Sequence, residues 1–235
     1  MELLIWGDQG WGDELFTASL MTIAISLSSY AVGLVFGCIG AALKLVENRW
    51  ANILGEIYTT VFRGIPELLV VYLFFFGGSL AVMSVASVFG YNGYIEVDAF
   101  IVGMLAIGVV AGAYAAESLR GGYLAIPKGL IEAGLACGMT RSHLARRVIF
   151  PQTLQYALPG LSNLWLINLK STALLSVTGL VELTRQANIA AGSTYKFLYF
   201  YIVAALIYAA LSFFSTIVIK RIETWSNRGT VRIKV

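Results

Sequence analysis

Charge is scarce in this sequence. Asp, Glu, Lys and Arg make up 12% of the 235 residues, and hydrophobic residues make up 58%. A soluble globular domain carries about 25% charged and about 45–50% apolar residues. A chain with so little charge cannot cover itself with a hydrated surface, so the composition argues against a soluble protein with buried core helices. The sequence predicts an integral membrane protein whose natural solvent is lipid.

Histidine and cysteine are nearly absent as well. The chain has one His, His143, and two Cys, Cys38 and Cys137. One Cys lies in an apolar run and the other in a basic segment, so we expect neither a disulfide nor a metal site. An intramembrane enzyme would need paired groups such as Ser with His, two Asp, or His-Glu-x-x-His. We therefore expect no catalytic residue, bound metal or bound cofactor, and a solvated His143.

Long apolar runs are what the sequence does contain. A helix needs about 20 mostly apolar residues to cross a hydrocarbon core of about 30 Å, and its backbone groups must pair internally. Strands of a membrane barrel would alternate in polarity, and these runs do not. The runs without Asp, Glu, Lys or Arg are residues 15–43, 68–95, 99–116, 148–169 and 197–219. The sequence thus predicts an all-α integral membrane protein with five transmembrane helices.

The basic residues predict the orientation, because Lys and Arg near span ends mark the cytoplasmic side. They concentrate in segments 44–63 and 120–147 and in a C-terminal tail, which share one side if there are five spans. We expect a periplasmic N-terminal segment, 1–14, which is acidic and unlike a signal peptide, and a cytoplasmic basic tail, 221–235. Between them lies a single transmembrane domain, 15–220. Attraction to anionic lipid explains the tail, so the net charge of +3 does not indicate a nucleic-acid partner.

The fourth span is the least regular, because Pro151 and Pro159 each remove a backbone donor near its start. The Ser/Thr-rich segment 171–180 that follows predicts a broken helix or a short re-entrant piece. Membranes tolerate such backbone only against protein or a water-filled cavity. Lys170 lies near the outer face if its helix starts at Gln152, and near mid-membrane if the helix starts at Gly160.

Charged groups in or near spans are candidates for function. Glu67 either serves the pathway or pairs with Arg63 one turn away, and the local pair is the simpler interpretation. Glu117 and Arg120 are spaced for a similar structural pair. The candidates for the translocation pathway are Lys170, Ser171, Thr172 and Glu67.

A segment of about 30 residues, at about 120–151, separates the third and fourth spans, and its composition indicates ordered structure. A proline opens a short helix over 128–137, and Gly138 suits the position that ends it. Thr140 can cap a second short helix whose exit is marked by Pro151. The pattern fits either an interfacial amphipathic hairpin or a docking site for a cytoplasmic partner.

The docking interpretation is favoured by a resemblance to the loop signature of permease subunits of ABC importers. That signature is Glu-Ala-Ala-x3-Gly-x9-Ile-x-Leu-Pro. Glu132, Ala133, Gly138 and Pro151 match it in register, and Gly134 stands in place of the second Ala. These five residues are the candidates for coupling to an ATPase.

Three further blocks narrow the family. Residues 62–69 read Phe-Arg-Gly-Ile-Pro-Glu-Leu-Leu, residues 113–122 read Ala-Tyr-Ala-Ala-Glu-Ser-Leu-Arg-Gly-Gly, and residues 170–177 read Lys-Ser-Thr-Ala-Leu-Leu-Ser-Val. The blocks resemble permeases for polar amino acids and opines, such as those for histidine, for lysine, arginine and ornithine, for octopine and for nopaline. The resemblance covers roughly residues 15–220.

The resemblance implies a type I ABC importer permease fold in the inner (cytoplasmic) membrane of a bacterium, crossed several times. The implied partners are a second permease subunit, either a similar chain or a copy of this one, a dimer of ATP-binding subunits, a periplasmic solute-binding protein and the lipid bilayer. Glu182 and Arg185, expected on the outer side, are candidates for docking the binding protein.

The implied function is ATP-driven import of a polar or basic amino acid or an opine, with ATP and Mg used by the separate ATPase. The sequence has no Gly-x-x-x-x-Gly-Lys-Ser/Thr phosphate loop, so we expect the motor to lie in another chain. The alternative is an ATP-independent secondary transporter or channel, which an inverted repeat would favour. The solute and the identity of the second permease stay open.

Overall fold

The computed structural model describes residues 2–7, 10–88, 90–91, 93 and 97–226, and the elements in these ranges are helical. They are η1 (Glu2–Leu4), α1 (Gly12–Leu45), α2 (Arg49–Gly64), α3 (Glu67–Val88), α4 (Ala99–Leu124), α5 (Lys128–Ala136), α6 (Arg141–Leu144), the π-helix η2 (Ala145–Ile149), α7 (Phe150–Ser171), the 3-10 helix η3 (Thr172–Thr178), α8 (Leu183–Thr194) and α9 (Phe197–Ser226). Residues 1, 8–9, 89, 92, 94–96 and 227–235, which include parts of the predicted N-terminal segment, second apolar run and basic tail, lie outside the described residues. The predicted all-α fold is confirmed.

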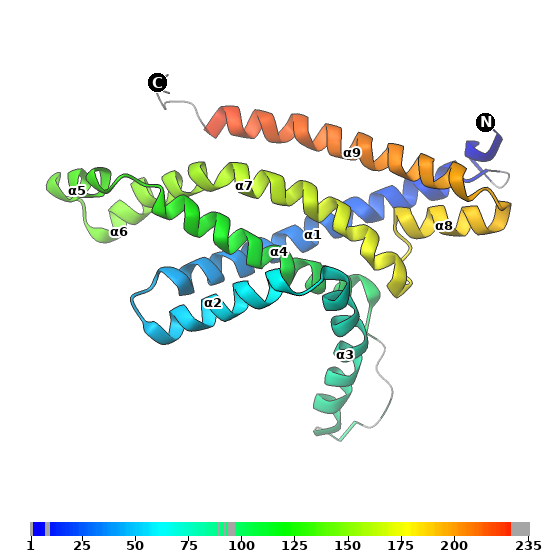
Figure 1. The fold of residues 1–235 in the computed structure, drawn as a ribbon, viewed down its shortest axis with the longest axis horizontal. Helices are drawn as coiled ribbons and strands as arrows, with labels where there is room; N and C mark the ends of the chain where they lie inside the picture. Colours follow the sequence, from blue (N-terminus) through cyan, green and yellow to red (C-terminus); the bar gives the residue numbers. More distant parts are fainter. Residues whose placement is uncertain (1, 8–9, 89, 92, 94–96, 227–235) are drawn as a thin grey trace.

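The long helices form an elongated bundle (Figure 1). Helices α1, α4, α7 and α9 run along its length, and α3 projects away from it. Helices α5 and α6 lie at one end, whereas α8, the N-terminus and the start of α9 lie at the other. The two ends of the bundle are therefore formed by different short helices.

Four helices, α1, α3, α4 and α9, are each long and apolar enough to cross a bilayer. The helical stretch 141–178 passes the same test only together with α8, and the two are bent by 49° at the break between them. The described residues thus hold four spans, or five if the bent pair is one span, and the five predicted spans match the second count.

Segment 44–63 is more structured than the predicted connection between two spans. Most of it forms α2, which folds back along α1 (Figure 1). The side chain of Asn48 caps this helix by accepting a hydrogen bond from the backbone N–H of Trp50, at 2.9 Å. The apolar-run criterion missed α2 because the helix carries Arg49, Glu56 and Arg63 within its length.

Small residues bring α1 and α4 together, and this pair makes the most extensive contact in the fold. A Cβ atom added at Gly37 would lie 2.5 Å from the Cβ of Ala115, and one at Gly108 would lie 2.9 Å from the backbone oxygen of Ser29. Small residues four apart let helix backbones approach closely in a membrane, where packing replaces the hydrophobic effect. This contact sets the relative position of the helices that carry Lys44 and Glu117, whose ion pair is described below.

The break after the fourth apolar run is confirmed. Helix α7 continues through Pro159 to Ser171, then tightens into η3, and Gly179 makes the turn with a φ of +88°. The left-handed conformation favours glycine, which has no Cβ to clash. Helix α8 then starts in a new direction.

Candidate functional site

Helix α5 lies at one end of the bundle, and none of its nine residues is buried (Figure 1). Glu132 and Ala133 are both exposed, and so are the apolar Leu130 and Leu135. Gly138 follows with a φ of +77°, which ends the helix as predicted. Isolated helices this short are marginal in water, and most helices in proteins owe their stability to tertiary packing. A short helix with free apolar side chains is suited to packing against another molecule.

Gly134 faces the other way, into the segment itself. A Cβ atom here would lie 2.5 Å from Cδ1 of Leu144, whose side chain is buried. The small residue therefore lets α5 lie close to α6. Of the coupling candidates, Glu132 and Ala133 are exposed on the helix, whereas Gly134 serves internal packing.

Pro151 does not mark the exit of a helix, and that expectation is wrong. Helix α6, the π-helix η2 and α7 follow one another without a break, and Pro151 lies in the first turn of α7. The backbone N–H of Phe150 donates to the carbonyl of Ala145, five residues back. A proline has no N–H and its ring crowds the carbonyl four residues back, so the wider π turn accommodates it within a continuous helix.

Two breaks in the helices meet at a hydrogen bond between Glu67 and Ser171. The Ser171 hydroxyl donates to Oε2 of Glu67 at 2.9 Å. Glu67 is the first residue of α3, after the gap that separates it from α2, and Ser171 is the last residue of α7. The expected local pair of Glu67 with Arg63 is absent from the ion pairs of the described residues, because Arg63 contacts Glu117 instead.

The other two pathway candidates differ in exposure. Thr172 is buried, and its hydroxyl donates to the carbonyl of Leu169 at 2.8 Å. Lys170 is exposed. Because α7 starts at Phe150, Lys170 lies about 30 Å along it, which corresponds to the first of the two alternatives for its position.

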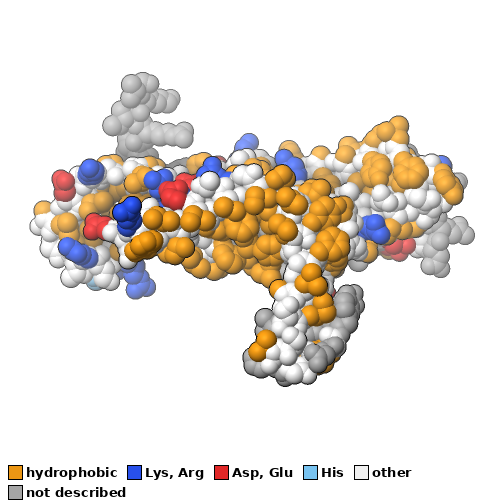
Figure 2. All heavy atoms as spheres, turned by 60° about the horizontal axis from the view of Figure 1, so that its bottom comes forward, with side chains coloured by type: hydrophobic (Ala, Val, Ile, Leu, Met, Phe, Trp, Pro, Cys, Tyr) orange, Lys and Arg blue, Asp and Glu red, His pale blue; other side chains and the backbone are white. Residues whose placement is uncertain are grey.

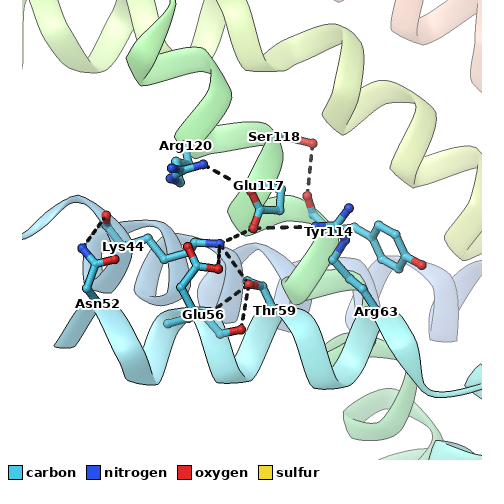
Figure 3. Close-up of polar contacts among 10 residues, drawn as sticks. Lys44, Asn52, Glu56, Thr59, Arg63, Tyr114, Glu117, Ser118 and Arg120 are labelled. Atoms are coloured by element: carbon cyan, nitrogen blue, oxygen red, sulfur yellow. Dashed lines mark hydrogen bonds and ion pairs between the residues drawn. The ribbon is translucent and has the colours of Figure 1, made fainter. Parts of the chain in front are cut away.

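A network of charges joins α1, α2 and α4 (Figure 3). The Lys44 ammonium pairs with Oε2 of Glu56 at 3.0 Å and with Glu117, and it donates to the Thr59 hydroxyl at 3.0 Å. Only 2% of the Lys44 side chain is exposed. Burying an ammonium without partners would cost several kcal/mol of desolvation free energy, so the two carboxylates stabilise Lys44 in its buried position.

Two arginines share the same carboxylate. Nη1 of Arg63 lies 3.6 Å from Oε1 of Glu117, and Nη1 of Arg120 lies 3.7 Å from Oε2. The Arg63 guanidinium also lies 5.4 Å from the ring centroid of Tyr114, within the range of a cation–π contact. The predicted pair of Glu117 with Arg120 is confirmed, but it is one part of a larger network that sequence spacing did not indicate.

Glu182 is part of the internal structure at the opposite end. Its two carboxylate oxygens accept from the backbone N–H groups of Thr184 and Arg185, each at 2.8 Å, and the Tyr208 hydroxyl donates to it at 3.0 Å. The residue is fully buried and caps α8. Arg185 is partly exposed, so it is the member of this pair that a partner could reach.

The comparison with known families decides what kind of protein carries this arrangement. The model for the inner membrane component of binding-protein-dependent transport systems matches residues 33–227. This chain belongs to that family. The match includes the exposed α5, the helix breaks and the charge network, so these features are parts of a transport permease.

Individual permeases are similar over nearly their whole length. The octopine transport system permease protein OccQ of Agrobacterium tumefaciens is 48% identical over 98% of both chains. The nopaline permease NocQ of Agrobacterium fabrum is 47% identical over 97% of this chain and 98% of its own, and the histidine/lysine/arginine/ornithine permease HisQ of Escherichia coli is 37% identical over 95% and 97%. A solved structure, the crystal structure of an amino acid ABC transporter with histidines, has a TM-score of 0.78 at 29% identity and covers 91% of this chain and 94% of its own.

The permease fold brings together blocks that are far apart in the sequence. Block 62–69 meets block 113–122 through Arg63 and Glu117, and it meets block 170–177 through Glu67 and Ser171. Sequence reasoning did not single out Lys44, Arg63 or Tyr114 for a site. The only available signal was that Arg63 and Tyr114 lie inside the blocks that carry the family resemblance.

Proposed function

We propose that this permease, together with a second permease subunit, forms the membrane pathway of an ATP-driven importer for a polar or basic amino acid or an opine. A periplasmic binding protein delivers the solute, and a dimer of ATP-binding subunits, using ATP and Mg, drives its passage into the cytoplasm. The named solutes of the similar permeases are octopine, nopaline, histidine, lysine, arginine and ornithine, which supports this class of cargo. The proposed location is the bacterial inner membrane, in keeping with the family description.

The unburied helix α5 is the single observation that carries this proposal. It presents Glu132 and Ala133, with Leu130 and Leu135, to the outside at the basic end of the bundle. We assign this surface to the ATP-binding subunit. Pro151 belongs to the same device, because the continuous helix that contains it would carry a displacement of α5 into the bundle.

The pathway candidates gather where the helices are broken. Glu67 and Ser171 are hydrogen-bonded at the start of α3 and the end of α7, with Thr172 next in the chain and Lys170 exposed beside them. Irregular backbone in a membrane must face protein or water, which supports a place beside the translocation pathway. At the far end of the bundle, Arg185 is proposed to contact the binding protein.

Substitutions at Gly138 test the coupling role. We expect Gly138→Asp to reduce solute uptake at least tenfold while the protein still inserts in the membrane, because an added acid would meet the ATPase surface. Gly138 has a φ of +77°, which strains most side chains but is tolerated by Asn. Gly138→Asn is therefore the uncharged control of the same size: loss of ATPase co-purification in Asp alone indicates that the acid meets the partner, and loss in both variants indicates strain or a steric block.

Reconstitution with and without the ATPase distinguishes the proposed importer from an ATP-independent transporter. Proteoliposomes that contain the permease pair without the ATPase should not accumulate solute, and addition of the ATPase, binding protein and ATP should restore uptake. Normal uptake by Gly138→Asp, or solute transport without an ATPase, would contradict the proposal.

A further inference from the structure

The arginine of the Arg-Gly-Ile-Pro block has more hydrogen-bonding capacity than its surroundings use. A guanidinium has five N–H donors. The Arg63 guanidinium makes no hydrogen bond within the described residues, and its only ion pair is the 3.6 Å contact with Glu117. That distance is too long for a hydrogen bond. Its remaining contact is the stacking position beside the Tyr114 ring, which holds the guanidinium without consuming its donors.

This arginine is also accessible from outside the described fold. Its side chain is 43% exposed, and Tyr114 is exposed on α4, a helix that is otherwise largely buried. A Cβ atom added at Gly64 or Gly121 would meet nothing within 4 Å. Arg63 lies about 21 Å along α2, toward the middle of the bundle's length and away from the turn that joins α1 to α2. Charged groups among membrane-spanning helices almost always face a water-filled cavity or the bundle interior and mark solute pathways.

The local charge is unbalanced toward the cation. Lys44, Arg63 and Arg120 share Glu117, and Lys44 uses the second carboxylate, Glu56. The site therefore has room for one more negative charge. A planar guanidinium with free donors on two edges binds a carboxylate with two parallel hydrogen bonds.

We propose that Arg63, held by Tyr114, binds a carboxylate of the transported solute during its passage. This rests on the proposed function, because it is the amino acids and opines of that class that supply the carboxylate. Arg63 then selects for acidic groups on the solute, and Tyr114 is a positioning residue. The other source of a carboxylate would be the second permease subunit, and the experiment separates the two.

The test measures equilibrium binding to the complete complex of permeases and ATPase in detergent, without the binding protein. The probes are L-arginine, octopine and agmatine, which is arginine without its carboxylate. We expect R63Q to weaken the binding of arginine and octopine by about tenfold or more and to leave agmatine unchanged, because a charge-assisted hydrogen bond is lost only with the carboxylate ligands. R63K, which keeps the charge but loses the planar pair of donors, should fall in between.

R120Q is the matched control. It removes the same charge from Glu117, but Figure 3 places Arg120 on the opposite side of that carboxylate from Arg63 and Tyr114. Equal losses in R120Q and R63Q, equal losses for arginine and agmatine, or unchanged arginine and octopine binding in R63Q would overturn the inference. Separation of the permease pair in R63Q on size-exclusion chromatography would also overturn it, in favour of a carboxylate from the partner.

The wild-type complex distinguishes this inference from the proposed function. If wild type binds and transports a carboxylate solute and R63Q does the same, only the role of Arg63 is wrong. If wild type binds neither arginine nor octopine and shows no uptake with the binding protein and ATP present, the proposed function fails as well.

Discussion

The buried charge of Lys44 is stable in this protein because two other helices supply its partners. Lys44 is almost fully enclosed, yet two carboxylates and the Thr59 hydroxyl surround its ammonium. Glu117 has more ionic contacts than Glu56, because it pairs with the buried Lys44 and with two partly exposed arginines. Glu56 contacts Lys44 alone and is 51% exposed. The two carboxylates should therefore differ strongly in their contribution to stability.

Neutralising each carboxylate in turn tests this difference. Glu117→Gln should lower the free energy of unfolding by about 3–5 kcal/mol, since the buried ammonium keeps only the half-exposed Glu56 as an anionic partner and the two arginines lose theirs. Glu56→Gln should cost about 0–1 kcal/mol, as expected for an exposed partner. The measurement is the loss of monodisperse protein on heating, followed by size-exclusion chromatography in detergent. Equal thermal stability of the two variants would show that Glu117 does not hold the network together.

Side-chain caps fix the starts of several helices in this fold. Polar side chains cap α2, α4, α6 and α8 through Asn48, Asp98, Thr140 and Glu182. Each cap accepts a hydrogen bond from a backbone N–H group in the first turn, which would otherwise lack a partner within its helix. Glu182 is fully buried and therefore acts as a cap, whereas its neighbour Arg185 is partly exposed and accessible to a partner.

Substitutions in α8 separate a cap from a docking residue. Glu182→Ala should destabilise the protein by about 1–2 kcal/mol, because two backbone donors lose their acceptor. Arg185→Ala should leave thermal stability unchanged and reduce the stimulation of ATP hydrolysis by the binding protein. The readouts are thermal unfolding and ATPase activity of the reconstituted importer, and unchanged stimulation in Arg185→Ala would remove this residue from the docking surface.

At the scale of the whole molecule, charge and hydrophobicity are segregated along the bundle. Figure 2 shows hydrophobic side chains covering the middle of this face, while charged side chains gather toward the end that carries α5 and α6. Basic residues mark the cytoplasmic side of a membrane protein. The α5 end should therefore face the cytoplasm, with α8 and the N-terminus on the periplasmic side.

The two native cysteines allow this orientation to be measured. Cys137 is exposed at the end of α5, and Cys38 is exposed on the apolar α1, where lipid would surround it. A membrane-impermeant maleimide should label Cys137 in inside-out vesicles but not in right-side-out vesicles. Cys38 should react only after detergent is added, because thiolate formation needs water.

Cys137→Ser identifies the labelled site, since it should abolish the signal in inside-out vesicles. Labelling of Cys137 from the periplasmic side would reverse the orientation and remove α5 from contact with any cytoplasmic ATPase.

Much of this architecture follows from local patterns. The apolar runs predicted α1, α4 and α9, and Gly138 and Thr140 marked helix boundaries that the structure confirms. Prediction failed where the answer depended on atoms distant in the sequence. The spacing of Arg63 and Glu67 favoured a local pair, yet the helix break between them turns Arg63 toward Glu117 and Glu67 toward Ser171.

The sequence alone determined that the protein lies in lipid, that it is helical and which family it resembles. Charge content, apolar run length and motif register are properties of the chain itself. Tertiary structure alone decided that Lys44, Arg63 and Glu117 form one network, and that Glu182 is buried while α5 is not. The physical reason is that ion pairing and burial depend on how helices pack. Close contact between α1 and α4, permitted by small residues in both, places charges from three helices within reach of one carboxylate.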